Sequence, residues 1–156
     1  MTIKTLFHNH GKLEPGLVEV KLLPGIPHLH VVGLPDASIK ETGIKLKSAI
    51  RSGKLEWPAG MQIIVSLRPT DFRKSGAGVD LPVALGYLAA TGQLPDRLRE
   101  VVASHVVYGE LALNGEIFAP ADIQRALRVA GAPVLTGRLQ GPLREGTWLE
   151  MAKLND

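Results

Sequence analysis

The chain has 156 residues, of which 45% are hydrophobic and 21% charged, a composition that excludes a disordered protein and fits one globular domain with its own core. The absence of cysteine excludes disulfides, thiolate zinc sites and a cysteine nucleophile, while the net charge of +3 permits contact with nucleic acid without arguing for it. No stretch approaches the roughly 18 apolar residues of a membrane span and the N-terminus has no secretory pattern, so we expect a cytoplasmic protein without a membrane partner.

The first third of the chain is expected to begin with strands. Apolar residues alternate weakly over residues 17–22, and the alternation resumes over residues 28–32. Residues 24–27 (PGIP) between them are typical of a turn, and residues 33–36 (GLPD) end the second strand. We therefore predict two short strands joined by a tight connection.

A helix is predicted next. Ser38 with Glu41 three residues later matches a capping box, and Gly53 is a typical helix end. The expected buried stripe follows helical spacing and contains Ile39, Gly43, Leu46 and Ile50.

The middle of the chain predicts a strand followed by a core helix. Residues 61–67 (MQIIVSL) form a short apolar run. A helix is expected over residues 81–90, with Asp80 as its cap, Pro82 in its first turn and Gly92 at its end. This helix is apolar nearly all round, so it should lie at the centre of the core.

The last third predicts a hairpin, a helix, a strand and a final helix. Residues 106–113 and 116–118 flank Asn114-Gly115, a strong hairpin pattern. The other predictions are a helix over residues 120–130 closed by Gly131, a strand over residues 134–136, and an amphipathic helix marked by Trp148, Met151 and Leu154. Without a strict strand–helix alternation, the expected fold is α/β in the α+β sense, a mixed sheet with packed helices.

Three segments, in order, resemble the N-terminal domain of the ComM/YifB family of magnesium-chelatase-like AAA+ ATPases. They are residues 31–36 (VVGLPD) with the following Lys40-Glu41 and Ser48-Ala49-Ile50, residues 67–84 (LRPTDFRKSGAGVDLPVA), and residues 108–116 (YGELALNGE). Together the likeness extends over about residues 17 to 131. Residues 119–122 depart from it, being shorter than the family segment at that place.

The resemblance implies a single domain over residues 1–156 with the ribosomal protein S5 domain 2-like fold that the Lon proteolytic domain shares. In the family this domain precedes an AAA+ ATPase module, and the better-studied members are hexameric helicases of DNA branch migration. The implied partners are therefore DNA, the ATPase module or further copies of the chain. Gly11-Lys12 and Gly53-Lys54 are each followed by leucine and lack the upstream glycine of a Walker A loop, so we expect no ATPase module, nucleotide or other cofactor here.

The likeness to the Lon domain implies a protease loop that has lost its chemistry. The loop corresponds to Ser75, Gly76, Gly78 and Asp80, and Gly78 stands where the serine nucleophile would be. Where the catalytic lysine would fall, the chain has Gln124 and Arg125, and arginine stays protonated and cannot act as a base. We therefore predict no catalytic residues and no enzyme, and a residual hydrolase that uses Ser75 or Ser66 ranks last among the functions.

Two histidine pairs have spacing that suits a metal. His8 and His10, like His28 and His30, are two residues apart and would lie on one face of a strand. A third ligand is not evident near either pair, and strand histidines without a metal are the commoner case. We therefore predict no metal site.

Two basic segments are candidates for contact with nucleic acid. The predicted first helix has a stripe of Lys40, Lys47, Arg51 and Lys54, which could follow a phosphate backbone, although such a stripe is more often a solvated helix face. The loop that contains Arg68, Arg73 and Lys74 among glycines suits an anion, or simply a tight connection. The aromatic residues do not cluster in the sequence, which argues against a base-stacking platform.

The first hypothesis is therefore a non-catalytic accessory domain that serves DNA handling or ring assembly. The alternative is a free-standing basic S5-like domain that binds nucleic acid directly. Salt-dependent binding of DNA by the isolated chain would separate the two.

Overall fold

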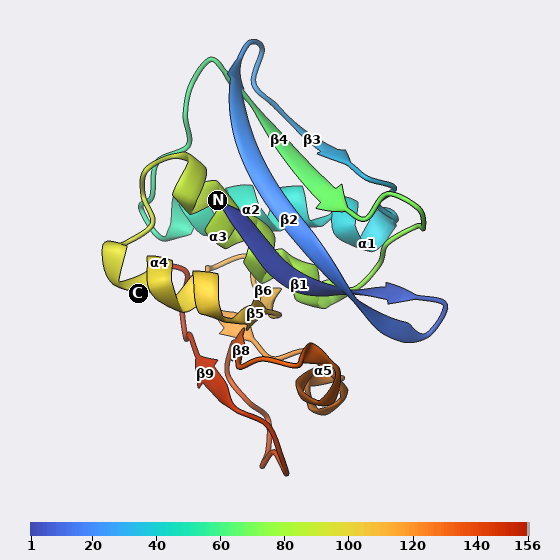
Figure 1. The fold of residues 1–156 in the computed structure, drawn as a ribbon. Helices are drawn as coiled ribbons and strands as arrows, with labels where there is room; N and C mark the ends of the chain where they lie inside the picture. The colour runs from blue at the N-terminus through green and yellow to red at the C-terminus, as the bar shows by residue number, and fades with distance from the viewer. Residues whose placement is uncertain (156) are drawn as a thin grey trace.

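The computed structural model describes residues 1–155, and a four-stranded mixed sheet runs through its N-terminal half (Figure 1). Its strands are β1 (Thr2–Asn9), β2 (Lys12–Pro24), β3 (His28–Val32) and β4 (Met61–Arg68), in the order β1-β2-β4-β3. β2 is antiparallel to both neighbours, whereas β3 is parallel to β4. The predicted mixed sheet is confirmed, and the S5-like label stays a prediction.

β1 and the first half of β2 were not predicted because polar residues and a proline interrupt their apolar pattern. Thr5 lies on the inner face of β1, where its hydroxyl donates to the carbonyl of Val107 at 2.7 Å. Pro15 stands opposite Leu6 of β1, at an end of β2 that β4 does not reach, since β4 begins to pair with β2 only at Leu17. His10 and Gly11 join the strands with positive φ angles of 50° and 81°, as in a two-residue hairpin turn.

Two consecutive helices, α1 (Ala37–Lys40) and α2 (Thr42–Ser52), replace the one predicted helix. The capping box is wrong: Asp36 is the N-cap, and its carboxylate accepts from the backbone N–H of Ser38 at 2.9 Å and from the Ser38 hydroxyl. The buried stripe is confirmed at Ile39, Leu46 and Ile50, and the structure adds Thr42 and Ala49 to it, while Gly43 is half-buried.

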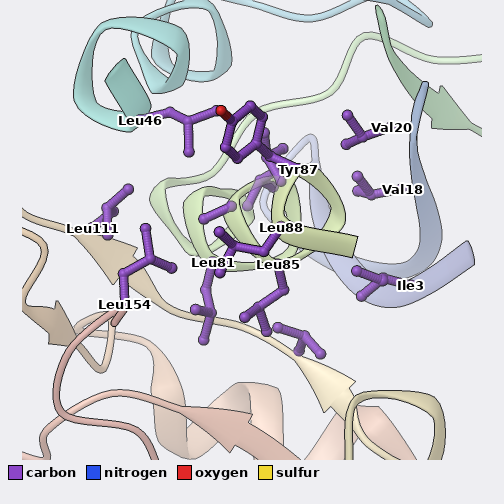
Figure 2. Packing of buried hydrophobic residues seen from close by; sticks show 14 of the residues in the cluster. Ile3, Val18, Val20, Leu46, Leu81, Leu85, Tyr87, Leu88, Leu111 and Leu154 are labelled. Carbon is purple, nitrogen blue, oxygen red and sulfur yellow. The ribbon is translucent and has the colours of Figure 1, made fainter. Parts of the chain in front are cut away.

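α3 (Asp80–Ala90) follows a short 3-10 turn at Ala77–Val79 and is the predicted core helix. In Figure 2 it is surrounded by Leu46 of α2, by Val18 and Val20 of β2, and by Leu111 and Leu154 from the C-terminal half. Gly86 permits close approach to the sheet, since a Cβ there would lie 2.7 Å from Val20 Cγ2. Asp80 is wrong as a cap, because it is already helical and its side chain bonds elsewhere.

Up to residue 155, the C-terminal half contains two helices and five short strands. They are α4 (Asp96–Ser104), β5 (Val106–Val107), β6 (Glu110–Leu111), β7 (Ile117–Phe118), α5 (Ile123–Ala130), β8 (Val134–Thr136) and β9 (Trp148–Glu150). β5, β8 and β9 form a parallel sheet, and β6 pairs with β7 around Asn114-Gly115. The hairpin, the strand over residues 134–136 and the left-handed Gly131 at the end of α5 are confirmed.

Three predictions in this half are wrong. The single strand over residues 106–113 is split, because Gly109 leaves the sheet to bond with Gly78 and Leu81 through the backbone. The helix over residues 120–130 starts at Ile123. The predicted final helix is absent from the described residues, because β9 is an extended strand there. Met151 and Leu154 are buried, and their backbone N–H groups donate to the carbonyls of Thr136 and Gly115.

None of the helices within residues 1–155 is both long and apolar enough to cross a membrane.

Tyr87 of α3 should make the stability of the fold fall at alkaline pH. Its hydroxyl donates to the carbonyl of Glu56, and burial raises the pKa of Tyr87 from 10.0 to about 12. The unfolded chain loses this proton first, so the free energy of unfolding should fall above about pH 10, by at most about 1.4 kcal/mol per pH unit for one proton. Urea unfolding measured up to about pH 12 should give a shallower fall for Tyr87→Phe, and equal slopes would contradict the assignment.

Candidate functional site

The loop that corresponds to a protease nucleophile is filled by a tyrosine. Gly78 is buried, and a Cβ at this position would lie 2.2 Å from Cε1 of Tyr108. The Gly109 N–H donates to the Gly78 carbonyl at 2.9 Å, which holds Tyr108 beside the loop. The fold therefore has no space for a serine side chain where the resemblance would place it.

The polar end of Tyr108 is tied to two residues from opposite ends of the chain. Its hydroxyl donates to the Asp122 carboxylate, with both oxygens at 3.0 Å, and lies 3.4 Å from Nε2 of His8. His8 and Asp122 are themselves 2.8 Å apart. Burial, followed by the nearby Asp122 carboxylate, raises the pKa of Tyr108, so this hydroxyl stays protonated. The cluster joins β1 to the start of α5.

The other residues of the predicted protease loop have backbone roles. Ser75 accepts from the His8 backbone N–H at 3.0 Å, and Gly76 donates to the Ser38 hydroxyl at 3.3 Å. Where the catalytic lysine would fall, Arg125 reaches instead to the carbonyl of Gly11 at 2.8 Å. Gln124 accepts from the Arg144 backbone at 3.0 Å.

Ser66, the other hydroxyl considered as a nucleophile, lies within β4. It pairs there with Glu19 of β2 and with Val32 of β3.

Asp80, the last residue of that loop, is a fully buried carboxylate with three donors. It accepts from Oγ1 of Thr42 at 2.5 Å, from Nζ of Lys45 at 3.0 Å and from the backbone N–H of Leu111 at 3.0 Å. These bonds join α2, α3 and β6. Burial and then the Asp80 charge raise the pKa of the nearby Glu110, and Lys45 opposes this rise. The arrangement is structural, since its buried charge is paired.

Lys74 was predicted to contact nucleic acid, but it does not lie on the surface. The residue is fully buried, and its ammonium donates to the carbonyls of Gly33 and Phe72, each at 2.7 Å. It also lies 4.6 Å from the centroid of the Phe72 ring. Burial lowers the pKa of Lys74, an effect that Asp71 partly opposes. An ammonium held inside the chain in this way is not free to contact a phosphate.

The remaining six basic candidates are exposed, and they belong to different elements of the fold. Lys47 and Arg51 project from α2 into a groove of about 600 Å³ beside β3. Lys40 is the last residue of α1, Lys54 lies in the turn after α2, and Arg73 lies on the loop before α3. Arg68 lines a separate cavity of about 400 Å³ among residues of β1, β2 and β5.

The groove between α2 and β3 also contains aromatic residues that the sequence patterns did not place there. Trp57 and His28 line it together with Lys47 and Arg51. Ile44 lines it as well and is 72% exposed. No aspartate or glutamate is among the described residues that form its walls. We refer to this feature as the α2–β3 groove.

The histidine pairs do not assemble a metal centre in the described chain. The rings of His28 and His30 meet edge to face with centroids 4.4 Å apart. His8 instead bonds to Asp122. Among residues 1–155, no group of three or more histidine, aspartate or glutamate side chains is placed to hold an ion.

Most of the chain, in one continuous stretch, is similar to known proteins. A model of the family described as subunit ChlI of Mg-chelatase matches residues 18–132. The chain is 40% identical over 125 residues to the uncharacterized protein YifB of Escherichia coli, covering 80% of this chain and 23% of YifB. It is 38% identical over 104 residues to the competence protein ComM of Haemophilus influenzae, covering 64% of this chain and 19% of ComM. The chain thus spans less than a quarter of the length of these relatives.

Proposed function

Because the chain belongs to the family of the ChlI subunit of Mg-chelatase, with relatives that include YifB and ComM, we propose that it is a non-catalytic accessory domain that contacts DNA for a longer Mg-chelatase-like ATPase. The work on DNA comes from the family resemblance of the sequence, and one relative is named a competence protein. The chain corresponds to less than a quarter of each relative, so the ATPase activity of a longer protein is itself part of the proposal.

The filled loop at Gly78 supports the non-catalytic part of the proposal. A serine protease needs a nucleophile beside a base. Here Tyr108 occupies the space of the nucleophile, and Arg125 is engaged with the Gly11 carbonyl. The place where Lon-like chemistry would be expected therefore stabilises the fold instead.

The meeting of Lys47 and Arg51 in the α2–β3 groove is the observation that carries the DNA-contacting part. The two residues are one helical turn apart, so their side chains leave α2 on the same side. With no carboxylate among the described lining residues, the groove should attract a phosphate backbone. A neutralised phosphate releases counterions, so this binding should weaken with salt.

Reversal of these two charges should weaken DNA binding about tenfold or more at low salt. The measurement is fluorescence anisotropy of the chain with single-stranded, duplex and four-way-junction DNA at two salt concentrations. The variant is Lys47→Glu with Arg51→Glu. Its matched control is Lys12→Glu with Arg99→Glu, which changes the net charge equally at exposed positions outside the groove.

Flat signals for the unmodified chain on all three DNAs at low salt would overturn direct DNA contact. Equal losses in the two double variants would reduce the effect to net charge. Retained binding with no salt dependence would also contradict the role of phosphates.

Ring assembly is the second candidate, favoured by apolar side chains around the outer strand β3. Ile26 is 85% exposed, and Val32 and Leu34 are each 49% exposed. β3 ends the order of the four-stranded sheet, so its outer edge has no described strand partner. Such an edge suits protein contact. Analytical ultracentrifugation of the chain and of its Ile26→Asp variant tests this, since a self-associating wild type should lose its larger species, and a strictly monomeric wild type would contradict self-assembly.

A further inference from the structure

We propose that the α2–β3 groove takes an unpaired base of single-stranded DNA against Trp57, with Lys47 and Arg51 on the adjoining phosphates. The inference rests on the proposed contact with DNA and adds the strand state and the contact mode. Its basis is the rigidity of Trp57, the volume and apolar walls of the groove, and the charge of its rim.

Trp57 is held in place before any ligand arrives. Its indole stacks on the ring of Tyr87, with centroids 5.2 Å apart and an interplanar angle of 23°. The preceding residue, Glu56, is fixed from both sides of its peptide by Gln93, which accepts from the Glu56 N–H at 2.7 Å and donates to the Glu56 carbonyl at 2.9 Å. Tyr87 donates to the same carbonyl. A ring fixed in this way loses little conformational freedom when a base stacks on it.

Gly43 lines the groove where α2 faces β3. A Cβ on Gly43 would lie 3.2 Å from Cδ2 of Leu29, so the helix and the strand approach closely there. The groove volume of about 600 Å³ lies within the roughly 300–1,000 Å³ typical of small-molecule pockets. Leu29 and Ile44 add apolar surface beside Trp57. These walls suit the flat, partly apolar faces of a nucleobase.

The charges on the rim select an anionic chain and the aromatic ring selects an unstacked base. Lys47 and Arg51 are exposed, and Ser48 and Ser52 between and beside them donate to the carbonyl of Leu113. A duplex presents its phosphates to the lysine and arginine but keeps its bases stacked inside, so it gains nothing from Trp57. A single strand uses both features, which is the usual composition of a single-strand site.

Photo-crosslinking of the unmodified chain gives the direct test. An oligothymidylate with one 5-iododeoxyuridine is irradiated with the protein, and the modified peptide is mapped by mass spectrometry. We expect the crosslink on Trp57 or His28, the aromatic residues that line the groove. A crosslink that maps only outside the groove would overturn the inference.

Affinity measurements then separate the base from the backbone. Trp57→Ala should weaken binding of the single strand about tenfold and leave duplex binding unchanged, because stacking contributes roughly 1–3 kcal/mol per base. Trp57→Phe keeps an aromatic ring and should lose less than about threefold. Thermal unfolding is followed for each variant, and Trp57→Phe and the crosslink keep the test decisive if Trp57→Ala unfolds. Trp148→Phe is the control for the other tryptophan.

The outcomes distinguish the two proposals. If Lys47→Glu with Arg51→Glu weakens binding but a folded Trp57→Ala does not, the contact with DNA stands and the base site fails. If no DNA binds the unmodified chain, both fail. If polyglutamate competes as well as oligothymidylate at equal charge, the groove accepts any acidic chain, and the base-stacking assignment is wrong.

Discussion

Replacing Gly78 with serine should destabilise the chain by about 3 kcal/mol or more instead of creating a nucleophile. The added Cβ would lie 2.2 Å from Cε1 of Tyr108, a ring held at its other end by Asp122. Neither the helical turn before α3 nor the tethered ring can move freely, because both are buried. Urea unfolding followed by circular dichroism should show a lower midpoint than for the unmodified chain.

A second substitution shows whether the tyrosine ring is the cause. In a Tyr108→Ala background the ring is gone, so Gly78→Ser should cost much less there than it does alone. Equal costs in the two backgrounds would mean that the strain arises elsewhere. The double variant should also remain inactive on casein, because no lysine base has been supplied. Hydrolysis by that variant would contradict the assignment of the loop as structural.

Replacing Asp80 with alanine should cost roughly 3–5 kcal/mol, the range for a broken buried ion pair. The change leaves the Thr42 hydroxyl, the Lys45 ammonium and the Leu111 N–H without their acceptor. Because these donors belong to different elements, the loss should loosen α2, α3 and β6 together. Urea unfolding measures the change, and hydrogen exchange at Leu111 should accelerate.

Glu100→Ala provides the matched control for Asp80, since it removes an exposed carboxylate from α4. Its effect should stay within about 0.5 kcal/mol. Asp80→Asn keeps the shape and one acceptor oxygen and should fall between the two. If Asp80→Ala were no more harmful than Glu100→Ala, the carboxylate would not be what holds the three elements together.

The parts of the fold that local chemistry decides could be predicted. Asn114-Gly115 has the turn residues of its hairpin, and Gly131 adopts the left-handed conformation that ends α5. The apolar surface of α3 requires a place inside the core. In contrast, the predicted cap Ser38 is wrong. Asp36, the residue directly before α1, is the cap, because its carboxylate accepts from the backbone N–H groups of Ser38 and Ile39.

The parts that depend on distant contacts could not be predicted. Thr5 belongs to a buried strand face only because Val107, 102 residues away, accepts its hydroxyl. Gly109 leaves the sheet because its backbone bonds to Gly78 and Leu81, which are far away in the sequence. In each case the local pattern is weak or misleading, and the decisive partner is supplied by the tertiary structure.

In the candidate site, too, features set by local spacing could be predicted and features set by distant contacts could not. The helical spacing of Lys47 and Arg51 correctly placed both on the exposed side of α2. The weaker evidence for Lys74, a basic residue in a glycine-rich loop, was misleading: Lys74 is buried, and its ammonium donates to the carbonyls of Gly33 and Phe72. Trp57 lies in the same groove as Lys47 and Arg51 because the chain turns between α2 and β4. The spacing of residues in the sequence does not predict such a turn.

The place of β4 between β2 and β3 has a consequence for the order of folding. β2 and β3 are consecutive in the chain, so a local hairpin between them would compete with the native sheet. Pro24 and Pro27 beside their connection lack the N–H groups that would close such a hairpin. The β1–β2 hairpin, with its tight turn, should therefore form early. The other edge of β2 then has no strand partner until β4 (residues 61–68) pairs with it. We expect this insertion of β4 between β2 and β3 to limit the rate at which the sheet is completed.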